Sequence, residues 1–235
     1  LAGQVTTITT AVPFLMIAPD SRSGAMGDAG VALSPDVNSL HWNPSKYAFI
    51  DDNFGTSISY TPWLRTIIDD INLSYLTGYW RLDDKQVFAA SLRYFSLGNI
   101  QFFNNQGTYT RDFNPNEFAL SGSYSRKLGD KISGGVALRY IYSNLTGGAF
   151  VGNTESHPGH SVAADISTYY ESNRFPFSNN EAKVAFGLNV SNIGAKITYT
   201  NEAEENFIPT NMRLGGAFTT YFDNYNSLTL TLDLN

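Results

Sequence analysis

The chain has 235 residues, with 15 Lys and Arg against 21 Asp and Glu, a formal net charge of −6 and no Cys. Aromatic residues make up 14% and charged residues only 15%, against roughly 25% charged in an average soluble domain. This composition excludes a disordered tail, a basic nucleic-acid-binding protein, a disulfide framework and a thiolate metal site. No run of 18 apolar residues is present, which excludes a membrane-spanning helix but not a membrane β-barrel, whose strands are half polar.

Residues 1–53 differ from the rest of the chain. They are rich in Ala, Gly, Ser, Pro and Asp, and only residues 12–18 form a continuous apolar stretch. That stretch is too short to span a bilayer, and no Lys or Arg precedes it as in a signal peptide. We therefore expect an irregular segment that packs on a larger body.

From Phe54 onward, apolar and small polar residues alternate with a period of two. The alternating runs begin near residues 54, 71, 86, 118, 131, 161, 183, 211 and 227. This period places one set on each face of a sheet. We expect the apolar set, which includes Leu73, Tyr75 and Tyr79 in the second run, to face outward into lipid. The runs reach about ten residues, the length of a tilted membrane-spanning strand, and aromatic residues gather at their ends.

The connections between the runs alternate in length. Short turns occur near residues 83–85, 129–130 and 223–226, whereas residues 62–70, 98–117, 144–160 and 201–209 form longer connections. The alternation holds if residues 184–200 are one strand kinked at 192–194, and residues 172–182 are a medium-length exception. Outer-membrane barrels have this asymmetry, with short periplasmic turns and long external loops. The sequence therefore predicts an all-β, transmembrane, antiparallel β-barrel over residues 54–235.

Nine strands is an odd number, whereas bacterial single-chain barrels have an even number. The chain also stops inside an alternating run, and an open sheet edge in lipid would leave backbone groups without hydrogen bonds. We therefore expect the chain to be a fragment of a larger barrel.

Four stretches carry a family resemblance. They are residues 23–32 (SGAMGDAGVA), 38–45 (NSLHWNPS), 191–197 (SNIGAKI) and 209–215 (PTNMRLG). Together they resemble the PorV family, which is related to the FadL-type outer-membrane transporters and to PorQ. The FadL-type hatch ends in a similar Asn-Pro-Ala, where this chain has Ser45 in the third position. The resemblance implies a 14-stranded barrel, of which this chain holds about nine strands, with residues 1–53 as an N-terminal hatch.

The resemblance also implies a function. PorV is an outer-membrane shuttle of the type IX protein secretion system. It would bind the large translocon barrel and the C-terminal signal domain of secreted cargo, and pass the cargo to the sortase-containing attachment complex. Outer-membrane lipid and lipopolysaccharide would surround it, and no nucleic acid or cofactor would be needed.

Five residues of the expected hatch attract attention. Asn43 and Pro44 form a turn dipeptide, and the turn preference of both residues favours a structural hatch turn, with gating as the alternative. Gly24, Gly27 and Gly30 lack the spacing and the strand–helix context of a dinucleotide-binding loop. We expect tight packing inside the barrel to explain these glycines.

No catalytic or metal site emerges from the sequence. His157 and His160 flank a Pro-Gly turn, and the third His, His41, lies far away in the chain, so three or four metal ligands do not assemble. No Gly-x-Ser-x-Gly elbow is present. Arg139 and Asp165 should face the interior from neighbouring strands, and we expect them to form an ion pair rather than to act in catalysis.

Two long connections carry unexpected apolar side chains, which are Trp63, Leu64, Ile67, Ile68, Ile100, Phe102 and Phe103. Exposed apolar patches usually indicate interaction sites. We expect these residues to contact a partner barrel or its cargo. Alternatively, the loops bury these groups over the barrel mouth, or Trp63 belongs to the outer aromatic girdle.

Two other functions remain open. A FadL-like transporter of hydrophobic small molecules would have an apolar pocket beside residues 12–18 and a side opening in the wall. An outer-membrane lipid-modifying enzyme would need a Ser/His or carboxylate cluster at the outer rim, and the sequence offers none. We therefore expect a protein that is not an enzyme.

Overall fold

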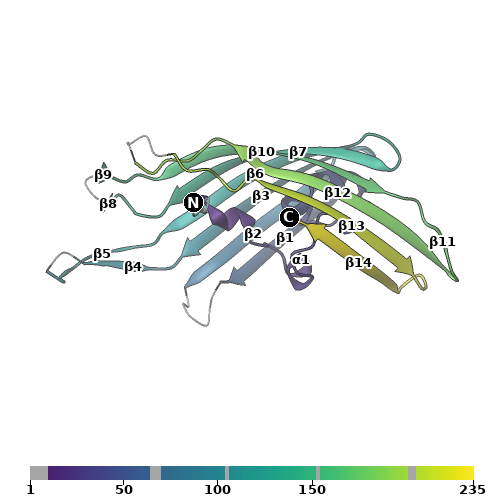
Figure 1. Ribbon diagram of the computed structural model, residues 1–235, viewed down its shortest axis with the longest axis horizontal. Helices are drawn as coiled ribbons and strands as arrows, with labels where there is room; N and C mark the ends of the chain where they lie inside the picture. Colours follow the sequence, from purple (N-terminus) through teal and green to yellow (C-terminus); the bar gives the residue numbers. More distant parts are fainter. Residues whose placement is uncertain (1–9, 64–69, 104–105, 152–153, 201–204) are drawn as a thin grey trace, which may run out of the picture.

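The structure is a computed structural model that describes residues 10–63, 70–103, 106–151, 154–200 and 205–235. Its main element is one antiparallel sheet in which each strand pairs with the next strand along its path (Figure 1). The strands of this path are β1 (Phe54–Pro62), β2 (Ile71–Arg81), β3 (Gln86–Leu97), β6 (Asn116–Lys127), β7 (Ile132–Asn144), β10 (Gly159–Glu171), β12 (Asn180–Gly194), β13 (Asn211–Tyr221) and β14 (Ser227–Leu234). The nine predicted strands and the all-β class are confirmed. Among the described residues, no helix is both long and apolar enough to cross a bilayer.

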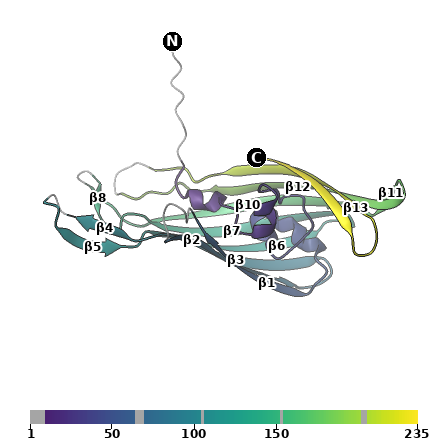
Figure 2. The ribbon, with the colours of Figure 1, turned by 90° about the horizontal axis from the view of Figure 1, so that it is seen from below.

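The sheet is strongly curved but not closed. Strands β1 and β14 lie at its two edges, and within the described residues each pairs with a single neighbour. The strands between them form a continuous curved wall around residues 10–53 (Figure 2).

The connections lie at two distinct ends of the sheet. At the short-turn end, residues 82–85, 128–131 and 222–225 form three turns with the same backbone hydrogen bonds. At the long-loop end, the connections contain two hairpins of their own, β4 (Ile100–Phe103) with β5 (Tyr109–Phe113), and β8 (Phe150–Val151) with β9 (Thr154–Glu155) (Figure 1). The predicted alternation of short and long connections is confirmed. Strand β11 (Phe175–Phe177) pairs with β12 and explains the medium-length exception.

Strand β12 differs from the prediction at its end. Asn192 adopts a left-handed conformation, with φ of 57°, and the pairing with β10 shifts register opposite Asp165. The predicted kink is therefore a β-bulge. The prediction that the strand continues to Thr200 was wrong, because the chain leaves the sheet after Gly194 and makes only isolated bridges beyond it.

The two faces of the sheet differ as the alternation predicts. Apolar side chains on the convex face are exposed, for example Leu230 at 64% and Phe186 at 55%, whereas Ser133 and Asn189 on the concave face are fully buried. A second sheet that covers the apolar face is absent from the described residues. Strand β2 is the exception, because its Leu73, Tyr75 and Tyr79 are buried on the concave face and Trp80 is exposed instead. The outward orientation predicted for that set was wrong.

Residues 10–53, which we call the N-terminal segment, lie within the curve of the sheet (Figure 2). The segment contains η1 (Pro13–Met16), α1 (Ser21–Ala25), α2 (Ser39–Trp42) and η2 (Pro44–Phe49). Each of the two 3-10 helices begins with Pro, which tolerates the first helical position, and Asp20 caps α1 by accepting from the Ser23 backbone N–H. Helix η2 packs on β6, β7 and β10. Leu40 and Tyr47 of the segment also form a buried cluster with Tyr79 of β2. This contact explains why large side chains of β2 face the concave side.

Candidate functional site

Asn43 anchors the N-terminal segment to the wall of the sheet. Its side chain is fully buried, and its Nδ2 donates hydrogen bonds to the carbonyl oxygens of Val31 and of Thr168 on β10, both at 3.0 Å. Its Oδ1 accepts from the backbone N–H of Ser45 at 3.1 Å. The next residue, Pro44, accepts from the hydroxyl of Ser125 on β6 at 2.6 Å. The structure thus brings Asn43 and Pro44 together at the contact between segment and sheet.

The three glycines have different surroundings. A Cβ at Gly30 would overlap the Trp42 ring, so this position requires the close approach that only glycine permits. Gly27 is exposed and adopts φ of 71° in the turn after α1, whereas Gly24 is exposed and has no atom within 4 Å of an added Cβ. The expectation of tight packing was therefore wrong for Gly24 and Gly27.

Serines of the concave face hold helix η2 in place. Ser133 on β7 donates to the Ser45 carbonyl at 2.7 Å, and Ser167 on β10 accepts from the Ser45 N–H at 3.1 Å. Asn189 on β12 donates to the Trp42 carbonyl at 3.0 Å. We did not single out these residues from the sequence. The serines that recur on the small-residue face of the predicted strands were the available signal.

Lys46 places an ammonium group at this contact. Its side chain is buried and donates to the Gly30 carbonyl at 2.7 Å, and no carboxylate lies within 4 Å of it in the described part of the chain. Burial lowers the pKa of Lys46 to about 8, partly opposed by the charge of Asp36. Asp233 on β14 accepts from the neighbouring Gly30 and Val31 N–H groups at 2.7 and 2.9 Å, which fixes the segment to the last strand as well.

His41 lies between two buried arginines. Arg93 on β3 approaches His41 Nδ1 at 2.7 Å and donates to the Leu15 carbonyl at 2.7 Å. Arg213 on β13 donates to the His41 carbonyl at 3.3 Å and stacks 5.0 Å from the centre of the Trp42 ring. Burial, together with the charges of Arg93, Arg213 and Arg139, holds the pKa of His41 well below its usual value. His41 is therefore neutral, and it accepts a hydrogen bond from Arg93 through Nδ1.

The predicted ion pair between Arg139 and Asp165 is confirmed. Arg139 Nη2 on β7 lies 2.9 Å from Asp165 Oδ2 on β10, and both side chains are buried. The bulge residue Asn192 joins the pair, because its N–H donates to Asp165 Oδ1 at 2.8 Å and its Oδ1 accepts from Arg139. Its Nδ2 donates to the Pro209 carbonyl at 2.9 Å. These groups fix the bulge, which makes their role structural.

An apolar cluster closes the concavity toward the long-loop end. Val12, Phe14 and Leu15 of the N-terminal segment pack there with residues of several strands and with Ile197 and Ile208 of the β12–β13 connection. The backbone N–H of Ala11 donates to the Phe207 carbonyl at 2.9 Å. The segment and this connection therefore cover the interior together.

The β4–β5 hairpin presents exposed apolar groups beyond this cluster. Phe103 is 56% and Tyr109 51% exposed, Ile100 is exposed, and Phe102 is half-buried. The guanidinium of Arg111 lies 4.9 Å from the centre of the Phe102 ring and donates to the Gly147 carbonyl of the next long connection at 2.8 Å. The structure thus brings Ile100, Phe102 and Phe103 together. Tyr109 and Arg111 belong to the same surface but were not singled out from the sequence.

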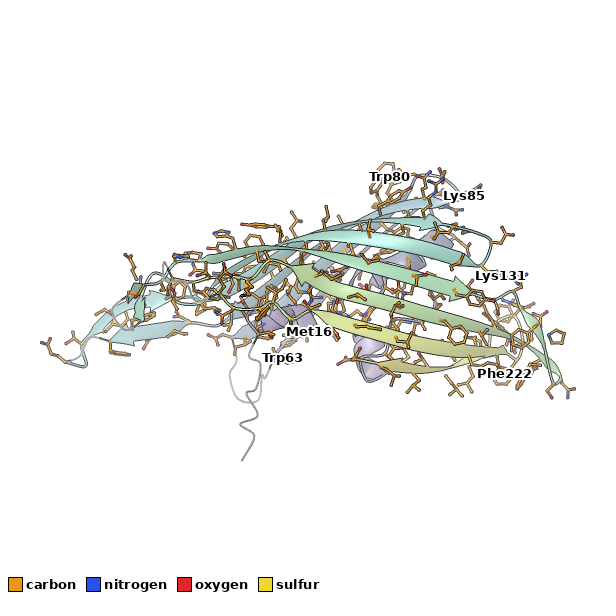
Figure 3. All side chains as sticks on the ribbon, turned by 45° about the horizontal axis from the view of Figure 1, so that its top comes forward. Met16, Trp63, Trp80, Lys85, Lys131 and Phe222 are labelled. Atoms are coloured by element: carbon orange, nitrogen blue, oxygen red, sulfur yellow. The ribbon has the colours of Figure 1, made fainter. Side chains whose placement is uncertain are left out.

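Trp63 lies apart from this hairpin, beside Met16 of the N-terminal segment (Figure 3). Leu64, Ile67 and Ile68 lie outside the described residues. Trp63 and Met16 line a cavity of about 680 Å³ between the segment and β1, which Ile17 and Tyr60 also line and to which Asp20 and Asp28 contribute polar groups.

Comparison with known proteins identifies the family. The family model described as "Type IX secretion system protein PorV" matches residues 2–235. None of the curated proteins matched the chain. Because the match covers essentially the whole sequence, the chain belongs to the PorV family and is a component of the type IX secretion system.

Proposed function

We propose that the protein is an outer-membrane shuttle of the type IX system, whose work is recognition rather than catalysis. The convex face of exposed apolar side chains would lie in the bilayer, with aromatic residues near the strand ends. The long-loop end would face outward, bind the large translocon barrel and the C-terminal signal domain of cargo, and release the cargo to the attachment complex. The family assignment carries this proposal, and the exposed apolar hairpin supports it.

The β4–β5 hairpin is the contact surface that we assign to these partners. Aromatic residues and Arg are the side chains that most often dominate the binding energy of protein interfaces. Arg111 holds the Phe102 ring and the β7–β10 connection together, so the hairpin is anchored while Ile100, Phe103 and Tyr109 remain exposed. An anchored surface loses little conformational entropy when it binds.

Replacement of Ile100, Phe103 and Tyr109 by Ser should reduce the amount of translocon barrel that co-purifies with the protein, and the amount of cargo at the cell surface. Each substitution should weaken binding by about 1–2 kcal/mol, because the removed side chain no longer buries apolar surface in the complex. A matched control replaces the exposed apolar residues Leu82, Leu128 and Phe222 of the short-turn end by Ser. Undiminished co-purification in the hairpin variant would refute this assignment.

The cavity between the N-terminal segment and β1 favours a second candidate, a FadL-like transporter of hydrophobic small molecules. It lies beside residues 16–18, and its volume of about 680 Å³ suits a small amphipathic ligand. Organic extraction of the purified protein, followed by mass spectrometry, tests this candidate. A stoichiometric apolar compound that is lost when Ala25 is replaced by Trp would support transport, whereas an empty extract would leave only the secretion role.

A further inference from the structure

We propose that the convex face carries a binding site for one anionic phospholipid at the short-turn end, with its acyl chain in an apolar groove over β1, β2, β3 and β6 and its phosphate on Lys85, Arg126 and Lys131. The proposal rests on the proposed membrane location, because the groove must face lipid. Figure 3 shows Lys85, Lys131 and the groove residue Trp80 at the same end of the sheet.

The groove has a volume of about 600 Å³ and an almost purely apolar lining. Its floor follows the strand register, in which Thr56 pairs with Gly78, Gly78 with Ala90, and Ala90 with Gly122. Larger side chains form its walls, with Trp80 and Phe88 toward the turns and Leu76, Leu92 and Leu120 on the other side. Gly122 continues this floor beyond the residues that line the groove, and no atom lies within 4 Å of a Cβ added to it.

Unpaired cations lie beside this groove. Arg126 is exposed on the same face of β6 as Gly122 and is paired in register with Gln86 of β3. Lys85 directly precedes Gln86, and its carbonyl accepts from the Lys127 N–H at 2.8 Å. Lys131 is exposed in the adjacent β6–β7 turn. Among the described residues, none of these three cations has a carboxylate oxygen within 4 Å.

The other cations at this end have contacts of their own. The ammonium of Lys127 lies 5.3 Å from the centre of the Phe49 ring. Arg174 lies 3.3 Å from Glu181 and stacks on Tyr221, and Lys183 pairs with Glu171. Arg81 pairs with Asp84 at 3.0 Å. Asp83 accepts from the Lys85 N–H and the Gln86 side chain, so it stabilises the turn. These hydrogen bonds and the charge of Arg126 hold the pKa of Asp83 below its usual value. The charge available to an anion is therefore concentrated over β3, β6 and β7.

The spacing fits one lipid molecule. Four residues separate Ala90 on the groove floor from Gln86 beside Arg126, which is about 13 Å along a strand. One leaflet contributes about 15 Å of hydrocarbon. A lipid whose acyl chain occupies the groove can therefore place its phosphate at Arg126, and a Lys or Arg near a membrane surface favours anionic over neutral headgroups.

Native mass spectrometry of the full-length protein, released from nanodiscs of equal phosphatidylglycerol and phosphatidylethanolamine, tests the site. The wild type should retain one phosphatidylglycerol in preference to phosphatidylethanolamine. Lys85→Gln with Arg126→Gln should lower that preference about fivefold for each cation removed. Gly122→Leu, which fills open space, should abolish retention of either lipid. The control Arg174→Gln with Lys183→Gln should behave as the wild type.

Equal retention of both lipids by the wild type, or an unchanged preference in the Lys85/Arg126 variant, would overturn the inference. Heat-modifiable migration on gels verifies that every variant is folded. Membrane fractionation and cargo secretion are measured separately in the same strains. A protein that fractionates with the outer membrane and supports secretion, yet shows no lipid preference, would refute only the lipid site.

Discussion

His41 stays uncharged because it is buried and because its surroundings already hold positive charge. Arg93 and Arg213 contact it directly, and the carboxylate of Asp165 is engaged by Arg139. A protonated imidazole here would lose its hydration and also its acceptor role toward Arg93. The packing of the N-terminal segment around His41 should therefore depend on pH.

Acidification should weaken the fold through His41. The pKa of His41 in the folded protein lies well below the unfolded value of 6.5, so both states are neutral above pH 6.5 and stability is fully present there. As the pH falls below 6.5, His41 binds a proton in the unfolded state but stays neutral in the folded state. The free energy of unfolding should then fall by up to about 1.4 kcal/mol per pH unit.

Urea unfolding in detergent micelles between pH 7.5 and 5 measures this dependence. His41→Gln keeps an acceptor for Arg93 and should flatten the curve, whereas His160→Gln, at an exposed strand position, should leave it unchanged. A wild-type slope in the His41 variant would show that other groups cause the acid sensitivity.

At the scale of single elements, the β12 bulge depends on its ion pair. Asn192 can adopt its left-handed conformation at modest strain, because Asn tolerates this region better than most residues. Asp165 and Arg139 hold it from two neighbouring strands, and Thr210 donates to its carbonyl at 2.9 Å. The bulge thereby directs the β12–β13 connection toward the N-terminal segment.

Removal of one partner of this pair should be more harmful than removal of both. Asp165→Asn leaves the buried Arg139 charge uncompensated and should lower the free energy of unfolding by about 3–5 kcal/mol. The double variant Arg139→Met with Asp165→Leu should lose less, because no buried charge remains. Urea unfolding in micelles compares the two. A double variant at least as unstable as Asp165→Asn would contradict this account.

The same elements show what the sequence could and could not predict. Period-two alternation locates all nine strands of the sheet, because the two faces of each strand lie in different environments and therefore carry different residue types. In β2 the alternation could not assign the faces, since Leu73 and Tyr79 meet the N-terminal segment while Leu76 and Trp80 face outward, and both sets are apolar. The alternation placed Ser125, Ser133 and Ser167 on the small-residue face, but it could not predict their contacts to the N-terminal segment, because a local pattern does not identify a distant partner.

For the molecule as a whole, the two ends of the sheet have different chemistry. The short-turn end carries compact turns with exposed Lys residues, whereas the long-loop end carries hairpins and the apolar cluster that covers the interior. The proposed secretion role requires the long-loop end to face outward, and the lipid site requires the short-turn end to meet the opposite leaflet. Both proposals therefore depend on one orientation in the membrane.

Because these 235 residues contain no Cys, single introduced thiols can test this orientation. Gln101→Cys, exposed in the β4–β5 hairpin, should react with a membrane-impermeant maleimide on intact cells. Asp130→Cys and Asn224→Cys, exposed in the short turns, should react only after the outer membrane is permeabilised. Ser133→Cys is buried against η2 and should stay unreactive until the protein is unfolded. If the turn variants are labelled on intact cells and Gln101→Cys is not, the orientation is the opposite of the one proposed. The hairpin would then lie on the periplasmic side, where it could not contact the translocon surface or exported cargo as proposed.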